Sequence, residues 1–150
     1  MNDPLLIARL AGQRIAFVAR EIESIVELGA VTPVPKAPEH IEGLATLRSE
    51  ALTVVDCTRM LGLPLDPHRQ GTAQQAAVIK RDGHLFALKL DDVEDVVEPT
   101  GDIESVLGGV GEEWSRFARG MIDTGSGAAL LLEVEPFIRT ESETEPAVLN

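Results

Sequence analysis

One segment of the sequence has residue types that suit acid–base catalysis, namely Asp123-Thr124-Gly125-Ser126. Two aspartate carboxylates held about 3 Å apart share one proton and can together hydrolyse a peptide bond. The chain carries this segment once, and residues 44–49, its counterpart in the internal repeat described below, read L-A-T-L-R-S. Catalysis would therefore require a homodimer in which each protomer contributes one Asp123.

The same segment also has a purely structural interpretation. Aspartate and glycine are favoured in tight turns, and apolar stretches lie on both sides, at residues 117–122 and 128–134. We therefore favour a hairpin turn and predict that the protein is not an enzyme. A homodimeric aspartic protease using Asp123-Thr124-Gly125 stays as the alternative.

Other groupings of reactive residues do not match known cofactor sites. His40, His68 and His84 do not have the spacing to each other, or to the single cysteine, that zinc sites use. The acidic residues 91–95 lack the pattern of a calcium-binding loop, and the glycine-rich residues 108–111 lack the Lys-Ser or Lys-Thr of a phosphate-binding loop. We predict no metal site and no cofactor.

The composition bounds the classes of partner. The 150 residues are 44% hydrophobic and 25% charged, which is enough for a globular core, but only 3% are aromatic. A net charge of -12 disfavours nucleic acid and anionic lipid as partners.

The single cysteine, Cys57, is expected to be a buried structural thiol, which fits a reducing compartment. The start M-N-D-P lacks the features of a signal peptide, and no apolar run approaches the roughly 20 residues that span a bilayer. We expect a cytoplasmic protein without membrane insertion.

Short apolar stretches separated by turn residues predict an all-β fold. They lie at residues 5–10, 15–19, 51–55, 76–79, 85–90 and 128–134, with glycine-containing turns at residues 11–13, 81–83 and 125–127. Helices are expected only as short turns at residues 56–61, where Asp56 can cap and Gly62 can terminate, and at residues 136–139. Residues 140–150 are expected to form a disordered acidic tail.

The chain contains an internal repeat. Setting Gly12 against Gly83 aligns I-E-S-I-V-E at residues 22–27 with V-E-D-V-V-E at residues 93–98, and a slightly larger offset aligns Gly43 with Gly120. The repeat predicts two related β units, at about residues 5–63 and 76–139, each closed into a barrel to hide its strand edges. Whether the two units exchange strands stays open.

The motifs in order along the chain resemble those of the CheW-like family of chemotaxis coupling proteins. Residues 34–49 read V-P-K-A-P-E-H-I-E-G-L-A-T-L-R-S, like the family's VP-x-x-P-x-x-(I/L)-x-G-(V/L)-x-NLRG. Residues 52–56 resemble its I-x-P-V-V-D, and residues 88–96 its G-L-x-V-D-x-V-x-x-V. The resemblance covers about residues 5–139, and marks a divergent member, because Thr46 and Ser49 replace the family's Asn and Gly.

The resemblance implies a fold of two five-stranded SH3-like barrels packed side by side within a single domain, residues 1–139. It implies a non-catalytic adaptor that couples the cytoplasmic tip of chemoreceptors to the regulatory domain of a CheA-type histidine kinase. It implies no cofactor. A scaffold protein with other partners is a further alternative.

The resemblance also indicates which residues bind the partners. Arg48 matches the arginine of the family's LR pair, and it is expected at the exposed end of a strand, where it contacts a receptor or the kinase. Around it we expect Leu47, with Ile22 and Ile25 from the first V-x-x-V segment and Val93 and Val96 from its repeat. At this spacing at least part of each V-x-x-V pair could instead belong to the core.

Overall fold

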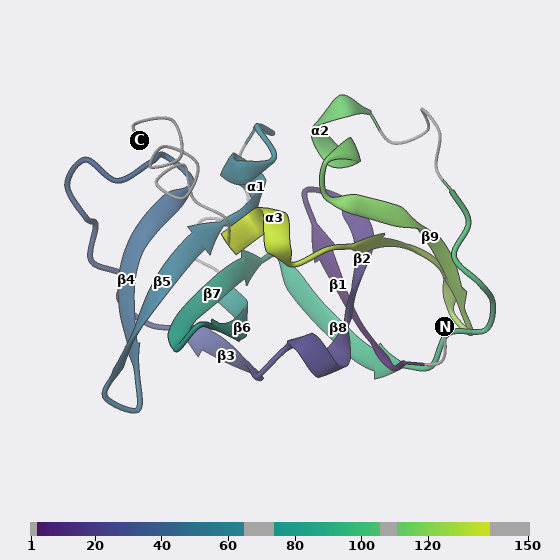
Figure 1. Cartoon of the computed structure of the whole chain (residues 1–150), viewed down its shortest axis with the longest axis horizontal. Helices are drawn as coiled ribbons and strands as arrows, with labels where there is room; N and C mark the ends of the chain where they lie inside the picture. The colour runs from purple at the N-terminus through teal and green to yellow at the C-terminus, as the bar shows by residue number, and fades with distance from the viewer. Residues whose placement is uncertain (1–2, 65–73, 106–110, 139–150) are drawn as a thin grey trace.

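The computed structural model describes residues 3–64, 74–105 and 111–138. These residues form two five-stranded sheets (Figure 1). Sheet A contains, in spatial order, β8 (Asp92–Val97), β1 (Leu5–Leu10), β2 (Gln13–Val18), β10 (Gly127–Leu132) and β9 (Ala118–Thr124). Sheet B contains β3 (Ser24–Leu28), β6 (Gln74–Arg81), β7 (His84–Leu90), β5 (Glu50–Asp56) and β4 (Ile41–Leu47). The prediction of an all-β fold with two five-stranded barrels side by side is confirmed.

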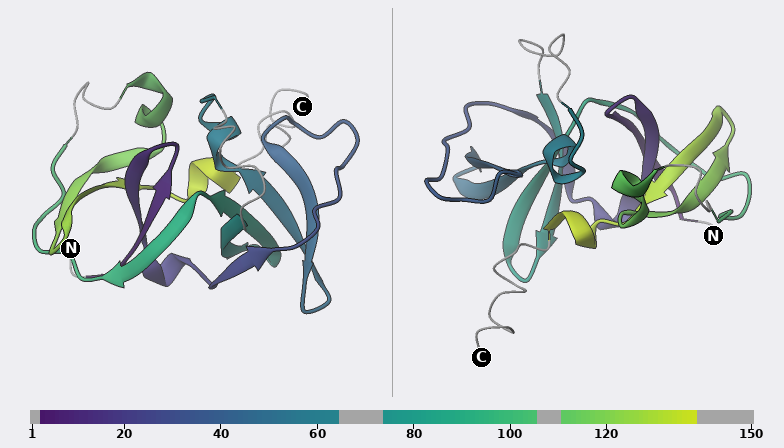
Figure 2. Two further views of the ribbon diagram at one scale, coloured as in Figure 1. Left: turned by 180° about the vertical axis from the view of Figure 1, so that it is seen from behind. Right: turned by 90° about the horizontal axis from the view of Figure 1, so that it is seen from above.

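Each sheet takes strands from both repeat units. The hairpin β1–β2 lies in sheet A with β8, β9 and β10, whereas β3, β4 and β5 lie in sheet B with the hairpin β6–β7. The two contributions meet through one parallel pair in each sheet, β2 with β10 and β5 with β7, and one antiparallel pair, β1 with β8 and β3 with β6. The chain therefore crosses from one barrel to the other after β2 and returns after β7, as the colours in Figures 1 and 2 show.

The apolar residues form three clusters. Sheets A and B form barrels A and B, respectively. One cluster fills barrel A and contains Leu5, Ile7, Ala16, Val18, Ile122, Ala129 and Leu131. A second fills barrel B and contains Ala45, Leu52, Val54, Ala76, Val78 and Ala87. The third, which we call the shared core, joins the two sheets and includes Leu6, Ile15, Phe17, Val55, Ile79, Leu88, Leu130 and Phe137. Successive residues of a strand point to opposite faces, so strands between a barrel interior and the shared core are apolar on both faces.

Three hairpins use two-residue loops in which both loop residues have positive φ. The loops are Ala11-Gly12, Arg48-Ser49 and Asp82-Gly83, flanked by the directly paired residues Leu10 and Gln13, Leu47 and Glu50, and Arg81 and His84. Positive φ at both positions is the geometry of type I′ turns, whose twist matches that of the strands. The predicted hairpins at residues 11–13, 81–83 and 125–127 are all present.

A glycine allows each barrel to close. Gly43 on β4 has φ of +153°, and a Cβ there would lie 2.2 Å from the carbonyl oxygen of Thr32. Gly120 on β9 has φ of +152°, and a Cβ there would lie 2.3 Å from the carbonyl oxygen of Glu104. The neighbouring β-bridges, Thr32 with Leu44 and Glu104 with Met121, seal the two edges. The two glycines therefore serve the same purpose in the two barrels.

Helix α1 (Cys57–Met60) follows from its sequence. The Asp56 carboxylate accepts a hydrogen bond from the Arg59 N–H at 3.2 Å, as expected of a cap. At the other end Gly62 has φ of +75°, its N–H donates to the Arg59 carbonyl, and the Leu63 N–H donates to the Thr58 carbonyl. These two bonds form a Schellman motif.

The helix prediction was incomplete elsewhere. Helix α3 (Glu135–Ile138) agrees with the expected turn, although residue 139 and the predicted tail at 140–150 lie outside the described residues. Helix α2 (Glu112–Ser115) and the 3-10 turn η1 (Ala19–Glu21) were not predicted. Helix α2 forms because it buries Trp114 against the shared core, a tertiary contact that four residues do not reveal.

Candidate protein-interaction site

Arg48 lies in the turn between β4 and β5. Arg48 and Ser49 have φ of +50° and +71°, so both adopt the left-handed backbone conformation, and both are exposed. Leu47, just before the turn, is half-buried and packs against the interior of barrel B. The turn thus presents Arg48 to solvent, while Leu47 anchors the strand that carries it.

In each V-x-x-V segment the first apolar residue is partly buried and the second is exposed. Ile22, at the end of η1, and Val93, on β8, are partly buried and pack against the shared core. Ile25 on β3 and Val96 on β8 are exposed, with 37% and 53% of their surface accessible. The sequence left open how much of each pair is core, and the first residue of each pair is the one that packs there.

The structure brings β3 and β8 close to the same strand, β6. Glu27 of β3 is paired with Gln75 of β6. The side-chain Oε1 of Gln75 accepts a hydrogen bond from the backbone N–H of Val93 at 2.9 Å. Figure 1 shows the β4–β5 turn at one outer end of the molecule and β8 in the other barrel. The predicted residues therefore form two areas, one on β3 and β8 and one at Arg48.

Exposed carboxylates flank the apolar residues of β3 and β8 along the chain. They are Glu21, Glu23, Glu27, Asp92, Asp95 and Glu98. Arg20, in the turn before β3, pairs with Asp3 at 2.8 Å. The surface on β3 and β8 is therefore apolar at Ile25 and Val96 and negatively charged around them.

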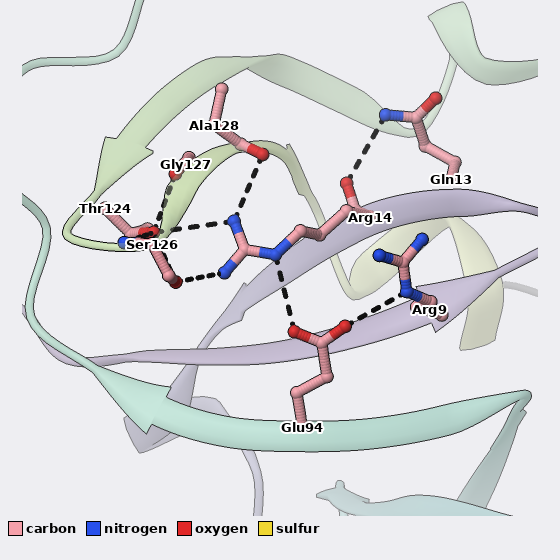
Figure 3. Close-up of polar contacts among 8 residues, drawn as sticks. All are labelled: Arg9, Gln13, Arg14, Glu94, Thr124, Ser126, Gly127 and Ala128. Atoms are coloured by element: carbon pink, nitrogen blue, oxygen red, sulfur yellow. Dashed lines mark hydrogen bonds and ion pairs between the residues drawn. The ribbon is translucent and has the colours of Figure 1, made fainter.

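Sequence reasoning missed the polar network at one end of barrel A (Figure 3). Arg14 of β2 donates to the hydroxyl of Ser126 at 2.6 Å, to the Ala128 carbonyl at 3.2 Å and to a Glu94 carboxylate oxygen at 3.4 Å. Arg9 of β1 donates to the other oxygen of Glu94 at 3.1 Å. The network joins β1, β2 and β8 to the β9–β10 turn. The sequence signal for it was the placement of two basic residues, Arg9 and Arg14, on either side of the turn at Gly12.

A second apolar area was also missed. Val34 and Leu44 have 39% and 42% of their surface exposed. Leu44 lies on β4, and its bridge to Thr32 brings the segment with Val34 alongside that strand. The motif of residues 34–49 contained both residues, but their exposure depends on the closure of barrel B.

Asp123-Thr124-Gly125 forms a hairpin turn. The Thr124 hydroxyl donates to the Gly127 carbonyl at 2.7 Å and accepts from the Ser126 N–H at 3.3 Å. Asp123 is exposed on β9 and pairs with Ala128 across the hairpin. These bonds stabilise the turn, as expected for the structural interpretation of this segment.

Cys57 has no side-chain exposure, and its thiol is close to the Val55 carbonyl. Burial raises the pKa of the Cys57 thiol well above its usual value, and the negative charges of Asp56 and Asp91 raise it further. A thiol in this state is a poor nucleophile. Across residues 3–64, 74–105 and 111–138, no group of three or more His, Cys, Asp or Glu side chains is arranged to hold a metal ion.

The helices of the described segments are all too short to cross a membrane.

Residues 4–142 match the family described as the CheW-like domain. The chain is 24% identical over 127 residues to a chemotaxis protein CheW of Thermotoga maritima, covering 84% of this chain and 81% of that protein. It is 28% identical over 149 residues to a probable chemotaxis protein CheW of Rhizobium etli, covering 95% and 92%. The crystal structure of the scaffolding protein TtCheW from Thermoanaerobacter tengcongensis has the same fold, with a TM-score of 0.75 and 19% identity, covering 89% of this chain and 86% of that one. Because the family match spans nearly the whole chain, this protein belongs to the CheW-like domain family.

Proposed function

We propose that this protein is a non-catalytic cytoplasmic adaptor that couples chemoreceptors to a CheA-type histidine kinase, in bacterial chemotaxis or a related chemosensory pathway. The family match and the relatives named as chemotaxis proteins support this role. The observation that carries the proposal is the exposure of Ile25 and Val96 at equivalent positions of β3 and β8. Single exposed apolar side chains are ordinary on protein surfaces, but a pair exposed at matched positions of the repeat favours a protein interface.

The separation of the predicted residues supports a coupling role. An adaptor must contact two partners at once, and the β3 and β8 area lies apart from Arg48. We assign Ile25 and Val96, backed by Ile22 and Val93, to one partner, and Arg48, anchored by Leu47, to the other. The receptor tip and the regulatory domain of the kinase are the two proposed partners.

The negative charge of the area on β3 and β8 predicts the charge of the partner surface that binds there. Exposed carboxylates flank Ile25 and Val96 along β3 and β8, so the matching surface should be apolar with basic residues beside it. Complementary charges accelerate association and are screened by salt, with a Debye length of about 8 Å at physiological ionic strength. Binding at this area should therefore weaken as the salt concentration rises.

A binding experiment with purified proteins tests the proposal. The kinase regulatory domain and a fragment of the receptor tip, both from the source bacterium, are titrated separately and together against the adaptor. We expect each to bind, and both to bind at the same time. Val96→Ser should weaken binding of one partner, and Arg48→Ala should weaken binding of the other. If neither partner binds the wild-type protein, the proposed function is wrong.

A further inference from the structure

We propose that Gln75 is a positioning residue that holds β8 at a set distance from β3, and so aligns the two V-x-x-V segments for binding. The inference rests on the proposed function for its consequence, partner binding. Its structural part, that Gln75 fixes the position of β8, rests on contacts between residues 23–28, 74–81 and 92–97. These contacts do not involve Asp56, Cys57 or Asp123.

Gln75 contacts both segments from one position. Its main chain lies in β6 directly opposite Glu27 of β3, within the ladder that also pairs Ile25 with Ala77. Its side chain reaches out of sheet B to the backbone of β8, where Oε1 accepts the Val93 N–H at 2.9 Å. One residue therefore spans the interval between the strand that carries Ile25 and the strand that carries Val96.

The backbone of β8 needs this bond. Val93 stands opposite Ala8 of β1 at a register shift, and its N–H donates to the Gln75 side chain. Leaving a partly buried N–H without an acceptor costs more than the net gain of an ordinary hydrogen bond. The bond therefore favours one position of β8 relative to sheet B.

The repeat shows that this contact is not a general feature of the segment. Ile22 corresponds to Val93, and its N–H donates to the Ala19 carbonyl at 3.0 Å, within the adjoining η1 turn. The N–H of Ile22 is thus satisfied locally. The N–H of Val93 is instead bonded to a side chain of the other barrel, so this bond ties the position of β8 to sheet B.

The edge of β8 is also closed to an added strand. The Val96 N–H donates to the Asp95 carboxylate at 2.8 Å, and the Val93 N–H is occupied by Gln75. The β-bulge in β8 and its carboxylates are further features that protect an edge strand from pairing with another chain. A partner must therefore recognise the side chains of β8, and their placement relative to β3 determines how well one surface can contact both.

Three variants test the role of Gln75. Gln75→Met keeps the length and removes the oxygen acceptor. The double variant Gln75→Glu with Glu27→Gln keeps an acceptor at the same reach without placing two carboxylates opposite each other. Gln13→Met makes the first change at the β1–β2 hairpin as a matched control. Amide hydrogen exchange at Val93 reports the bond directly. Titration of the receptor fragment and of the kinase domain reports its consequence.

We expect the Val93 amide to exchange about fivefold to tenfold faster in Gln75→Met, the range that one net hydrogen bond supports. The partner that contacts β3 and β8 should bind Gln75→Met several-fold more weakly. The double variant Gln75→Glu with Glu27→Gln should restore protection of Val93 and most of the affinity, whereas Gln13→Met should resemble the wild type. Restoration by Glu distinguishes positioning from a general loss of stability.

Two results would overturn the inference. One is unchanged exchange at Val93 in Gln75→Met. The other is a wild-type affinity for both partners in a Gln75→Met protein whose Val93 amide has lost protection. If the wild-type protein binds neither partner, the proposed function fails by itself. The hold of Gln75 on β8 is then decided by whether Met removes and Glu restores protection of the Val93 amide.

Discussion

Arg9 and Arg14 lie directly opposite each other on β1 and β2, and both donate to the carboxylate of Glu94. Like charges at directly opposed positions destabilise a sheet, so the shared carboxylate offsets a repulsion that the hairpin would otherwise carry. The two arginines differ in burial, with 16% of the Arg14 side chain exposed against 51% for Arg9.

This difference predicts unequal effects of the same substitution. Arg14→Met should lower the free energy of unfolding by about 2 kcal/mol, because it removes hydrogen bonds that hold the β9–β10 turn. Arg9→Met should change it by less than about 0.5 kcal/mol, as is typical of exposed ion pairs. Urea denaturation of both variants measures the difference, and equal losses would contradict this account of the network.

The glycines at which the barrels close predict a second contrast, again between the effects of two substitutions on stability. Gly43→Ala should lower the free energy of unfolding by about 3 kcal/mol, because its Cβ would overlap the Thr32 carbonyl and force barrel B open. Gly29→Ala is the matched control, since nothing lies within 4 Å of a Cβ at that position. Thermal unfolding monitored by circular dichroism compares the two, and a stable Gly43→Ala protein would show that the barrel closes differently.

The β4–β5 turn predicts a stabilising substitution. Ser49 has φ of +71°, a conformation that glycine adopts without the steric cost of a Cβ. Ser49→Gly should therefore raise the free energy of unfolding by about 0.5 to 1 kcal/mol. Ser24→Gly, in the extended backbone of β3, should lower it by a similar amount. Guanidinium titrations measure both, and a destabilised Ser49→Gly protein would mean that the Ser49 side chain makes a stabilising contact.

The two V-x-x-V segments predict a division between stability and binding. Ile22→Ala and Val93→Ala should each lower the free energy of unfolding by about 1 to 2 kcal/mol, because these side chains pack against the shared core. Ile25→Ala and Val96→Ala should change stability by less than about 0.5 kcal/mol and weaken partner binding by more than about 1 kcal/mol. Parallel stability and affinity measurements on the four variants check the division, which fails if the exposed pair binds normally.

The buried thiol predicts a pH dependence of stability. The pKa of Cys57 is raised in the folded state, so between the unfolded value of about 8.5 and the folded value the folded protein holds a proton that the unfolded chain releases. Its contribution is therefore fully present below about pH 8.5 and is lost as the pH rises towards the folded pKa.

We expect the wild-type protein to lose stability between about pH 8 and 10 relative to Cys57→Ala. The chain has no tyrosine, which removes one group that would titrate near this range. Urea midpoints measured across the range for both proteins give the difference. Parallel pH profiles would mean that the thiol is not held neutral by the fold.

The sequence alone predicted the local features of this protein. The turn at Asp82-Gly83 and the cap and termination of α1 by Asp56 and Gly62 depend on a few consecutive residues, and the structure has them as predicted. The apolar stretches predicted strands because burial on alternate faces leaves a pattern within one segment. The ordered motifs of residues 34–49 and 88–96 predicted the family and, through it, the two barrels.

Only the tertiary structure decided which strands share a barrel and which apolar residues remain exposed. The exchange of β8, β9 and β10 with β3, β4 and β5 joins residues far apart in the chain, and equivalent strands of a repeat can pair within or between units with similar local patterns. Ile22 and Ile25 look alike in sequence, yet the shared core covers Ile22 and leaves Ile25 exposed. Gln75 has no distinguishing neighbours, and its bond to Val93 exists because the second barrel places β6 beside β8. Exposure and contacts between barrels depend on how the sheets pack, and that packing is a property of the whole chain.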